Sequence, residues 1–156
     1  MSKKVLYSIT VSLSVILLDQ LSKFLVYSNL KLYQSIPVID DILKITYIHN
    51  PNSVFGLSLG DRFPYPLMIV VLVLVVTTVW YFEDRADFYI LYSAIIGGAV
   101  GNLIDRIRFH EVVDFIDVGI SKNLRWPVFN IADASISVSV VLILILSMIK
   151  SRKEEK

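Results

Sequence analysis

Two aspartates, Asp114 and Asp133, have the side chains and the spacing best suited to catalysis in this chain. Asp114 follows two valines in a segment of mixed polarity, and Asp133 stands 19 residues later, near the start of an apolar stretch. A connection of that length lets the two side chains meet. Two adjacent carboxylates share one proton, so one can activate water while the other donates to a carbonyl, as in aspartic proteases. Spacing alone leaves open that Asp114 is a solvated loop charge and that Asp133 is a charge at a helix N-terminus.

The composition argues against other catalytic chemistry. The chain has no cysteine, which excludes a disulfide framework, a thiolate metal site, an iron–sulfur cluster and a cysteine nucleophile. His49 and His110 lack metal-ligand spacing, and neither an H-E-x-x-H nor a G-x-S-x-G motif is present. Ser22 and Lys23 are adjacent, and adjacent helical residues do not face each other, so they cannot form a dyad unaided. We expect no metal and no cofactor, and the net charge of +1 gives no basic surface for nucleic acid.

Long apolar stretches must position these residues. The 156 residues are 55% hydrophobic and 19% charged, with a mean hydropathy of +0.66, whereas soluble domains are about 45–50% apolar and about 25% charged. We predict an all-α membrane protein with four transmembrane helices, a small extracytoplasmic β-sheet and an outer interfacial loop. The single membrane domain covers residues 1–156, with helices at about 5–25, 66–82, 88–107 and 129–149 and extracytoplasmic segments at about 30–62 and 108–127.

The two extracytoplasmic segments differ in character. Residues 42–48 are rich in β-branched side chains that roughly alternate with polar ones, which predicts one or two strands of a small sheet. Segment 108–127 mixes apolar pairs with charges, so we expect it to lie at the membrane interface. In the third apolar stretch, Gly97 and Gly101 form a small-xxx-small pattern that predicts close helix packing.

Basic residues indicate the orientation of the spans. Lys3 and Lys4 precede the first apolar stretch, and four basic residues follow the last: Lys150, Arg152, Lys153 and Lys156. The positive-inside rule therefore places both termini in the cytoplasm, which an even number of spans permits. No small-residue cleavage site follows the first stretch, so we expect a permanent span rather than a removed signal peptide.

Polar residues of three predicted spans fall at one depth. With a rise of about 1.5 Å per residue, Asp19 lies about 22 Å into the first span and Asn102 about 21 Å into the third, with Arg106 one turn further. Asp133 lies about 25 Å from the cytoplasmic end of the fourth span. All four residues fall in the outer leaflet of a hydrocarbon layer about 30 Å thick. Because a charge inside a bilayer costs a few kcal/mol, this convergence favours a functional site at the outer face.

Other interpretations of this polar level stay open on these grounds. A salt-bridge network that only holds the spans together would look the same, and a non-catalytic four-span assembly factor would use it that way. A small transporter or channel is a further alternative, although transporter sites favour the midplane of the bilayer.

Five motifs occur in order along nearly the whole chain: Asp19–Lys23, Asn50–Gly56, Gly97–Arg106, Val112–Phe115 and Phe129–Asp133. Together they resemble the motifs of the bacterial lipoprotein signal peptidases (signal peptidase II). The resemblance implies a four-span aspartyl endopeptidase of the bacterial inner membrane with a small extracytoplasmic sheet. Such an enzyme removes the signal peptide of a prolipoprotein by cleaving just before its diacylglyceryl-modified cysteine.

The resemblance also implies roles for individual residues. The two catalytic aspartates of the family match Asp114 and Asp133. The residues that line the polar site around them match Asp19, Lys23, Asn50, Asn102, Arg106 and Asn130. We expect Asn102 and Asn130 to orient the carboxylates, and Arg106 to pair with an acid such as Asp19 or to stabilise the fold. The expected partners are the lipid-modified prolipoprotein and membrane lipid, and we expect a monomer.

The chain departs from the family pattern at two places. The second motif of the family usually reads Asn-x-Gly-Ala-Ala-Phe, whereas residues 50–55 read N-P-N-S-V-F. A glycine is missing beside a proline that restricts the backbone, so the match of Asn50 carries less weight than the matches of the aspartates. His110 stands where the family commonly has glycine, four residues before Asp114, which affects how the loop presents that aspartate.

Overall fold

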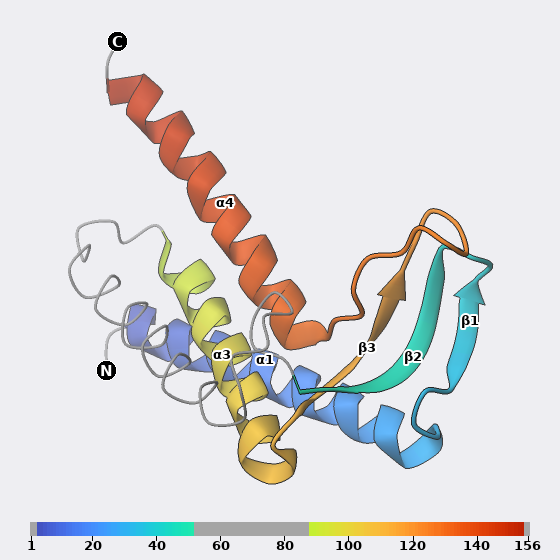
Figure 1. The fold of residues 1–156 in the computed structure, drawn as a ribbon. Coiled ribbons are helices and arrows are strands. Elements are labelled where there is room, and N and C mark those ends of the chain that lie inside the picture. The colour runs from blue at the N-terminus through green and yellow to red at the C-terminus, as the bar shows by residue number, and fades with distance from the viewer. Residues whose placement is uncertain (1–2, 52–87, 155–156) are drawn as a thin grey trace.

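The computed structural model describes residues 3–51 and 88–154, which form three helices and three strands (Figure 1). In chain order the elements are α1 (Lys3–Asn29), β1 (Ser35–Ile39), β2 (Leu43–Asn50), α3 (Tyr89–Phe109), β3 (Val112–Val118) and α4 (Ile131–Glu154). Each helix covers one of the predicted apolar stretches, and each is long and apolar enough to cross a membrane. The predicted span at residues 66–82 lies outside the described residues.

Helices α1 and α3 pack against each other and cross in the view of Figure 1. Near the start of both helices, Ser12 Oγ donates a hydrogen bond to the carbonyl oxygen of Ser93 at 2.7 Å. Further along both, Lys23 Nζ donates to Asn102 Oδ1 at 3.0 Å. Later residues of α1 contact later residues of α3, so the two helices are parallel and their C-terminal ends lie at the same end of the bundle.

Helix α4 packs against α3 in the opposite direction. Ser135 Oγ, in the second turn of α4, donates to the carbonyl oxygen of Ala94 at 3.1 Å. Asn130, just before α4, donates to Asn102 Oδ1, two turns further along α3, at 3.1 Å. The start of α4 therefore lies beside the C-terminal half of α3, at the same end of the bundle where α1 ends.

Small residues on α3 allow both helices to approach closely. A Cβ atom on Gly97 would lie 2.7 Å from the carbonyl oxygen of Ser12 in α1, and one on Gly98 would lie 2.6 Å from the carbonyl oxygen of Ala132 in α4. Gly101 is packed as tightly against α1. The close helix packing predicted from Gly97 and Gly101 is confirmed.

A three-stranded antiparallel sheet in the order β1–β2–β3 lies at the end of the bundle where α1 and α3 end and α4 begins (Figure 1). In the register, Ser35 of β1 lies opposite Thr46 of β2, and Asn50 at the end of β2 lies opposite Val112 at the start of β3. The strand predicted at residues 42–48 is confirmed by β2, whereas its hairpin partner β1 lies before that segment, at residues 35–39.

For segment 108–127 the sequence predicts an outer interfacial loop. The structure instead has strand β3 at residues 112–118 of this segment. The first four residues of β3 are all buried, so both faces of the strand are covered. A strand covered on both faces shows no alternation of polar and apolar residues, and that alternation is the pattern by which a strand is predicted from sequence. The position of this segment at the membrane interface stays a prediction.

A tight turn joins α3 to β3. His110 caps the C-terminus of α3 with φ 61° and ψ 3°, and its backbone N–H donates to the carbonyl oxygen of Arg106 at 3.0 Å. A left-handed residue costs about 1–2 kcal/mol for a side chain other than glycine. This backbone geometry explains why glycine suits the position in the family that the sequence resembles.

The side chain of Arg125 joins the loop after β3 to the sheet, in addition to backbone hydrogen bonds. Arg125 Nε donates to Asp117 Oδ1 at 2.6 Å, and its Nη1 donates to the carbonyl oxygen of Asp41 at 2.6 Å. Thr46 Oγ1 donates to the other oxygen of Asp117 at 2.7 Å. These contacts join the loop, β3 and β2 at the far end of the sheet from His110.

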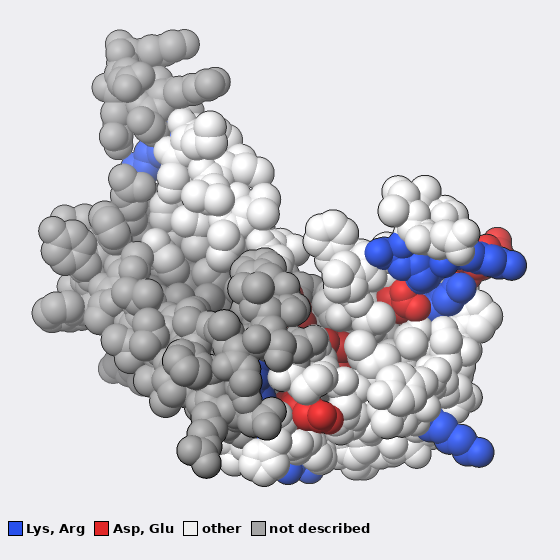
Figure 2. All heavy atoms as spheres, viewed as in Figure 1, with Lys and Arg blue, Asp and Glu red and all other residues white. Residues whose placement is uncertain are grey.

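Exposed side chains differ between the helices and the sheet. Large apolar side chains such as Val138, Leu144 and Met148 are exposed along α4. Figure 2 shows that much of the visible α4 surface is uncharged, whereas basic and acidic side chains gather at the far end of the sheet. An uncharged, apolar helix surface is typical of contact with lipid.

Candidate active site

The carboxylate of Asp114 is buried between two amide groups. Asp114 is only 1% exposed, so the possibility that it is a solvated loop charge is wrong. Asn50, at the end of β2, donates from Nδ2 to Asp114 Oδ2 at 2.8 Å. Asn130, just before α4, donates from Nδ2 to Asp114 Oδ1 at 2.7 Å. Each carboxylate oxygen therefore accepts a hydrogen bond from an amide.

Burial strongly affects the protonation of this carboxyl group. Desolvation is the largest influence and, with the nearby negative charge of Asp133, it raises the pKa of Asp114 to about 7, although the hydrogen bonds from Asn50 and Asn130 lower it. A carboxyl group with a pKa near neutrality exists in both protonation states at physiological pH. It can therefore accept and donate a proton in one reaction cycle.

Asp133 lies in the first turn of α4 and is half-buried. Its Oδ1 accepts a hydrogen bond from Asn102 Nδ2 at 2.7 Å. Its backbone N–H donates to Asn130 Oδ1 at 2.9 Å, which is the usual hydrogen bond of a helix N-cap. Because the cap requires the Asn130 oxygen, the amide nitrogen of Asn130 must face Asp114.

Lys23 is the cation at the centre of the cluster and is 1% exposed. Its Nζ lies 2.8 Å from Asp19 Oδ2, 2.9 Å from Asp105 Oδ2 and 3.0 Å from Asn102 Oδ1. An ammonium group only donates hydrogen bonds, so it orients the Asn102 oxygen toward itself and the Asn102 nitrogen toward Asp133. Lys23 thereby influences the position of Asp133 through one amide.

Asp19 connects α1 to the start of α4. Asp19 is fully buried, and its Oδ1 accepts a hydrogen bond from the backbone N–H of Ala132 at 2.9 Å. Its other oxygen makes the ion pair with Lys23, one helical turn away. Since Ala132 directly precedes Asp133, this carboxylate holds the first turn of α4 against α1.

Most of the residues singled out from the sequence meet in one hydrogen-bonded cluster at the end of the bundle beside the sheet. Hydrogen bonds and one ion pair join seven of them: Asp19, Lys23, Asn50, Asn102, Asp114, Asn130 and Asp133. Arg106 is also buried on α3, one turn beyond Asn102. Lys23 is the cation that pairs with Asp19, and a pairing of Arg106 with Asp19 stays a prediction.

Sequence reasoning missed two members of this cluster, Asp105 and Gln20. Asp105 is 1% exposed and accepts hydrogen bonds from the backbone N–H of Val113 at 3.1 Å and from Gln20 Nε2 at 2.9 Å. Asp105 follows Asn102 by three residues, a spacing that places both side chains on one face of α3. The three-residue spacing from Asn102 would have allowed Asp105 to be predicted as a member of the cluster.

The cluster offers carboxylates and amides for chemistry. Within residues 3–51 and 88–154, no three His, Asp or Glu side chains are grouped so that they could hold a metal ion. Asp19 is paired with Lys23, whereas Asp114 and Asp133 accept hydrogen bonds from neutral amides. The arrangement therefore suits proton transfer by the last two carboxylates.

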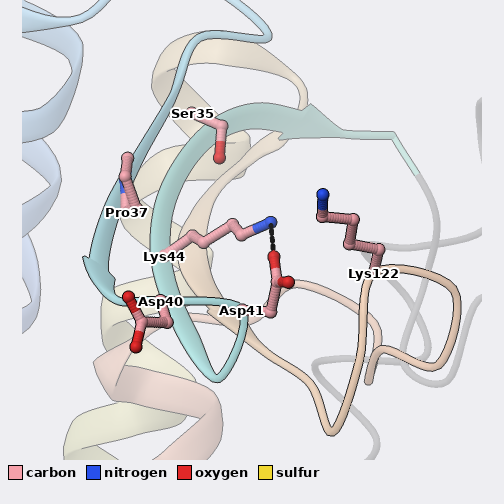
Figure 3. A pocket seen from close by; sticks show the side chains of 6 residues that line it. All are labelled: Ser35, Pro37, Asp40, Asp41, Lys44 and Lys122. Atoms are coloured by element: carbon pink, nitrogen blue, oxygen red, sulfur yellow. Dashed lines mark ion pairs between the residues drawn. The ribbon is translucent and has the colours of Figure 1, made fainter.

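A second polar hollow lies at the opposite end of the sheet (Figure 3). It is lined by Ser35, Pro37, Asp40, Asp41, Lys44 and Lys122. Lys44 and Asp41 form an ion pair at 3.2 Å, and both side chains are partly exposed. Lys44 is six residues from Asn50 along β2, about 20 Å in an extended strand, so this hollow is separate from the carboxylate cluster.

Comparisons with known proteins agree on one family. A family model described as signal peptidase (SPase) II matches residues 11–149. The lipoprotein signal peptidase of Halothermothrix orenii is 42% identical over 137 residues, which cover 86% of this chain and 90% of that protein. The lipoprotein signal peptidase of Syntrophus aciditrophicus is 40% identical over 158 residues, which cover 97% of this chain and 96% of that protein.

Two solved structures of bacterial membrane enzymes, both determined by the in meso method, have the same fold. One, at 2.3 Å resolution, matches with a TM-score of 0.79 and 30% identity over 96% of this chain and 91% of that chain. The other, at 1.9 Å resolution, matches with a TM-score of 0.76 and 34% identity over 89% of this chain and 90% of that chain.

Proposed function

Because this chain belongs to the signal peptidase II family, whose members remove signal peptides from prolipoproteins, we propose that Asp114 and Asp133 are the catalytic pair of an aspartic endopeptidase. The observation that carries the proposal is the pair of carboxylates on β3 and α4, each hydrogen-bonded to a neutral amide. The charge of Asp133 and burial together raise the pKa of Asp114 to about 7, which supports the sharing of one proton by the two groups.

The reaction follows the pattern of two carboxyl groups with one proton between them. The ionised carboxylate takes a proton from water as the water oxygen attacks the carbonyl carbon of the scissile peptide bond, and the protonated carboxyl group donates to the carbonyl oxygen. The tetrahedral intermediate then collapses. One hydroxyl proton returns to a carboxylate, the leaving nitrogen receives a proton from the other carboxyl group, and the carbon–nitrogen bond breaks. Asn50, Asn102 and Asn130 keep the two carboxyl groups oriented throughout.

The substrate we propose is a prolipoprotein cleaved just before its diacylglyceryl-modified cysteine. A lipid-modified cysteine lies near the membrane surface, and the cluster lies at the end of the bundle where α1 and α3 end and α4 begins. Membrane lipid is a further partner, and the enzyme acts as a monomer in the bacterial inner membrane.

We also propose four membrane spans in a single domain, with both termini in the cytoplasm. Since α1 and α3 run in the same direction, the chain between them must cross the membrane an odd number of times. The apolar stretch at residues 66–82 is the segment suited to that crossing.

The catalytic pair is tested by replacing each carboxyl group with an amide. Asp114→Asn and Asp133→Asn should each lower the cleavage rate of a lipid-modified precursor peptide by about 10²–10⁴-fold. Both variants should still insert and elute as folded protein, because an asparagine fits the same space. Cleavage is followed by the mobility shift of the product on a gel.

Asp117→Asn is the matched control, because Asp117 is a buried aspartate of the same strand that contacts Arg125 instead of the cluster. It should keep the wild-type cleavage rate per folded molecule. Normal processing by either Asp114→Asn or Asp133→Asn would contradict the proposal. Loss of folded protein with an unchanged rate per folded molecule would favour a packing role and a non-catalytic assembly factor.

A further inference from the structure

On the side opposite β2, the later residues of β3 bond to the backbone of Phe129 and Trp126, whereas Val113 near its start is held by side chains. At Val113, which is fully buried, the backbone N–H donates to Asp105 Oδ2 at 3.1 Å. The carbonyl oxygen of the same residue accepts from Asn130 Nδ2 at 3.3 Å. Val113 directly precedes Asp114, so these two contacts fix the backbone on one side of Asp114, while the pairing with β2 and the bond from the Phe115 N–H to the carbonyl oxygen of Phe129 fix it on the others.

The carboxylate of Asp105 is itself fixed by helix α1. Its Oδ2 is 2.9 Å from Lys23 Nζ, and its Oδ1 accepts a hydrogen bond from Gln20 Nε2 at 2.9 Å. Gln20 Nε2 also donates to the carbonyl oxygen of Gly101, which keeps its amide in place. With both oxygens occupied and 1% of its surface exposed, the Asp105 side chain cannot rotate without losing a buried hydrogen bond.

Lys23 is common to the two paths that lead to the carboxylates of the proposed pair. One path runs from Lys23 through Asp105 to the backbone beside Asp114. The other runs from Lys23 through Asn102 to the side chain of Asp133. The two carboxyl groups are therefore positioned from the same ammonium group, although they lie on different elements.

We propose that Asp105 is a positioning residue, which holds β3 so that Asp114 meets Asp133 at the distance that catalysis needs. This inference rests on the proposed function of Asp114 and Asp133 and assigns Asp105 no contact with substrate. A displacement of about 1 Å in a catalytic group lowers a rate by about 100-fold. The effect of losing Asp105 should therefore appear in kcat, while substrate binding is unchanged.

The test compares two variants of Asp105 in the purified full-length enzyme with a lipid-modified precursor peptide. Asp105→Ala removes the acceptor for Val113 and should lower kcat by about 100-fold, with KM within about twofold. Asp105→Asn keeps an oxygen that can accept the Val113 N–H and should recover about tenfold of the loss. A role limited to balancing the charge of Lys23 predicts instead that both variants are equally impaired, since both remove the negative charge.

Asp117→Ala is the matched control, since it removes a buried carboxylate of β3 that lies outside the cluster. It should lower thermal stability and leave kcat per folded molecule unchanged. If Asp105→Ala keeps kcat per folded molecule within threefold of wild type, or if Asp105→Asn is no better than Asp105→Ala, the positioning role is overturned.

A milder variant covers the case in which Asp105→Ala does not fold. Gln20→Met leaves the ion pair of Lys23 and Asp105 intact but removes the amide that donates to one oxygen of Asp105, and also to Asp19 Oδ2 and the carbonyl oxygen of Gly101. It should lower kcat several-fold at constant KM. An unchanged kcat in Gln20→Met would also overturn the inference. Activity of Asp114→Asn separates the two levels: an active Asp114→Asn refutes the catalytic pair itself, whereas an inactive Asp114→Asn with a fully active Asp105→Ala refutes only the positioning role.

Discussion

Two asparagines, Asn102 and Asn130, orient the carboxyl groups of Asp133 and Asp114. Asn130 must present its oxygen to the N-cap bond of α4, and Asn102 must present its oxygen to Lys23, so both amide nitrogens face carboxylates. An aspartate in either position would lack these donors and bring another negative charge. Amide groups keep the site polar without adding to the repulsion between Asp114 and Asp133.

Removal of the amide at residue 50 should shift the pH dependence of cleavage. The hydrogen bond from Asn50 lowers the pKa of Asp114, whereas burial raises it to about 7. In Asn50→Ala the lowering contribution is lost, so the pKa of Asp114 rises further. Because the pair needs one proton and the carboxyl group with the raised pKa holds it, the alkaline limb of the pH–rate profile moves to higher pH. A hydrogen bond to a charged group is worth about 1.5 kcal/mol, which corresponds to about one pH unit.

The control for this shift is Asn29→Ala. Asn29 is an exposed asparagine whose side chain bonds to the carbonyl oxygen of Leu25, so its removal should leave the profile unchanged. A pH–rate profile of Asn50→Ala that coincides with the wild-type profile would show that Asn50 does not influence the titration of the pair.

At the scale of elements, the site depends on how closely the three described helices approach one another. Gly98 is the point where α3 meets the start of α4, since an added Cβ would lie 2.6 Å from the carbonyl oxygen of Ala132 and 2.9 Å from Ile136 Cγ1. The neighbouring residue Asp133 accepts its hydrogen bond from Asn102, one turn along α3. Helix spacing and carboxylate position are thus coupled.

Gly98→Ala should separate α3 from α4 and weaken both the fold and the site. Overpacking of this kind costs about 1–3 kcal/mol of stability, measured as a lower denaturation temperature in detergent. The cleavage rate per folded molecule should also fall, because α4 carries Asp133. Ser137→Leu adds more volume on the exposed side of α4 and should change neither property. Wild-type stability and rate in Gly98→Ala would show that the interface can relax.

The sequence predicts this site through residue spacing within each helix, which also places Asp19, Asn102 and Asp133 at one depth, where they lie in one cluster. The four-residue spacing of Asp19 and Lys23 predicts a shared helix face, and the structure has an ion pair of 2.8 Å between them. Strand β3 was not predictable in this way, because its first residues are covered on both faces and include a charged side chain. The link from Asp105 to Val113 joins a helix to that strand, so it depends on the tertiary fold.

At the scale of the whole molecule, the apolar surface and the polar cluster divide the protein into two zones. The exposed apolar side chains of α4 suit lipid, whereas the carboxylates and Lys23 are buried at the end of the bundle beside the sheet. Loss of any one partner from a buried ionic cluster destabilises the protein, because it leaves a buried charge without its counter-charge. The cluster therefore requires α1, α3 and α4 to be assembled together.

The proposed topology gives a clear result in labelling experiments, because the chain has no cysteine of its own. Single cysteines at Lys31 and Lys122, both exposed, should react with a membrane-impermeant maleimide in intact spheroplasts. Cysteines at Ala86 and Lys153 should react only after the membrane is permeabilised. If the cysteines at positions 31 and 86 both react from outside, residues 66–82 do not cross the membrane, which would contradict the parallel arrangement of α1 and α3. Reaction of Lys153→Cys in intact spheroplasts would reverse the orientation and move the carboxylate cluster to the cytoplasmic face, where a lipid-modified precursor awaiting cleavage on the outer side could not reach it.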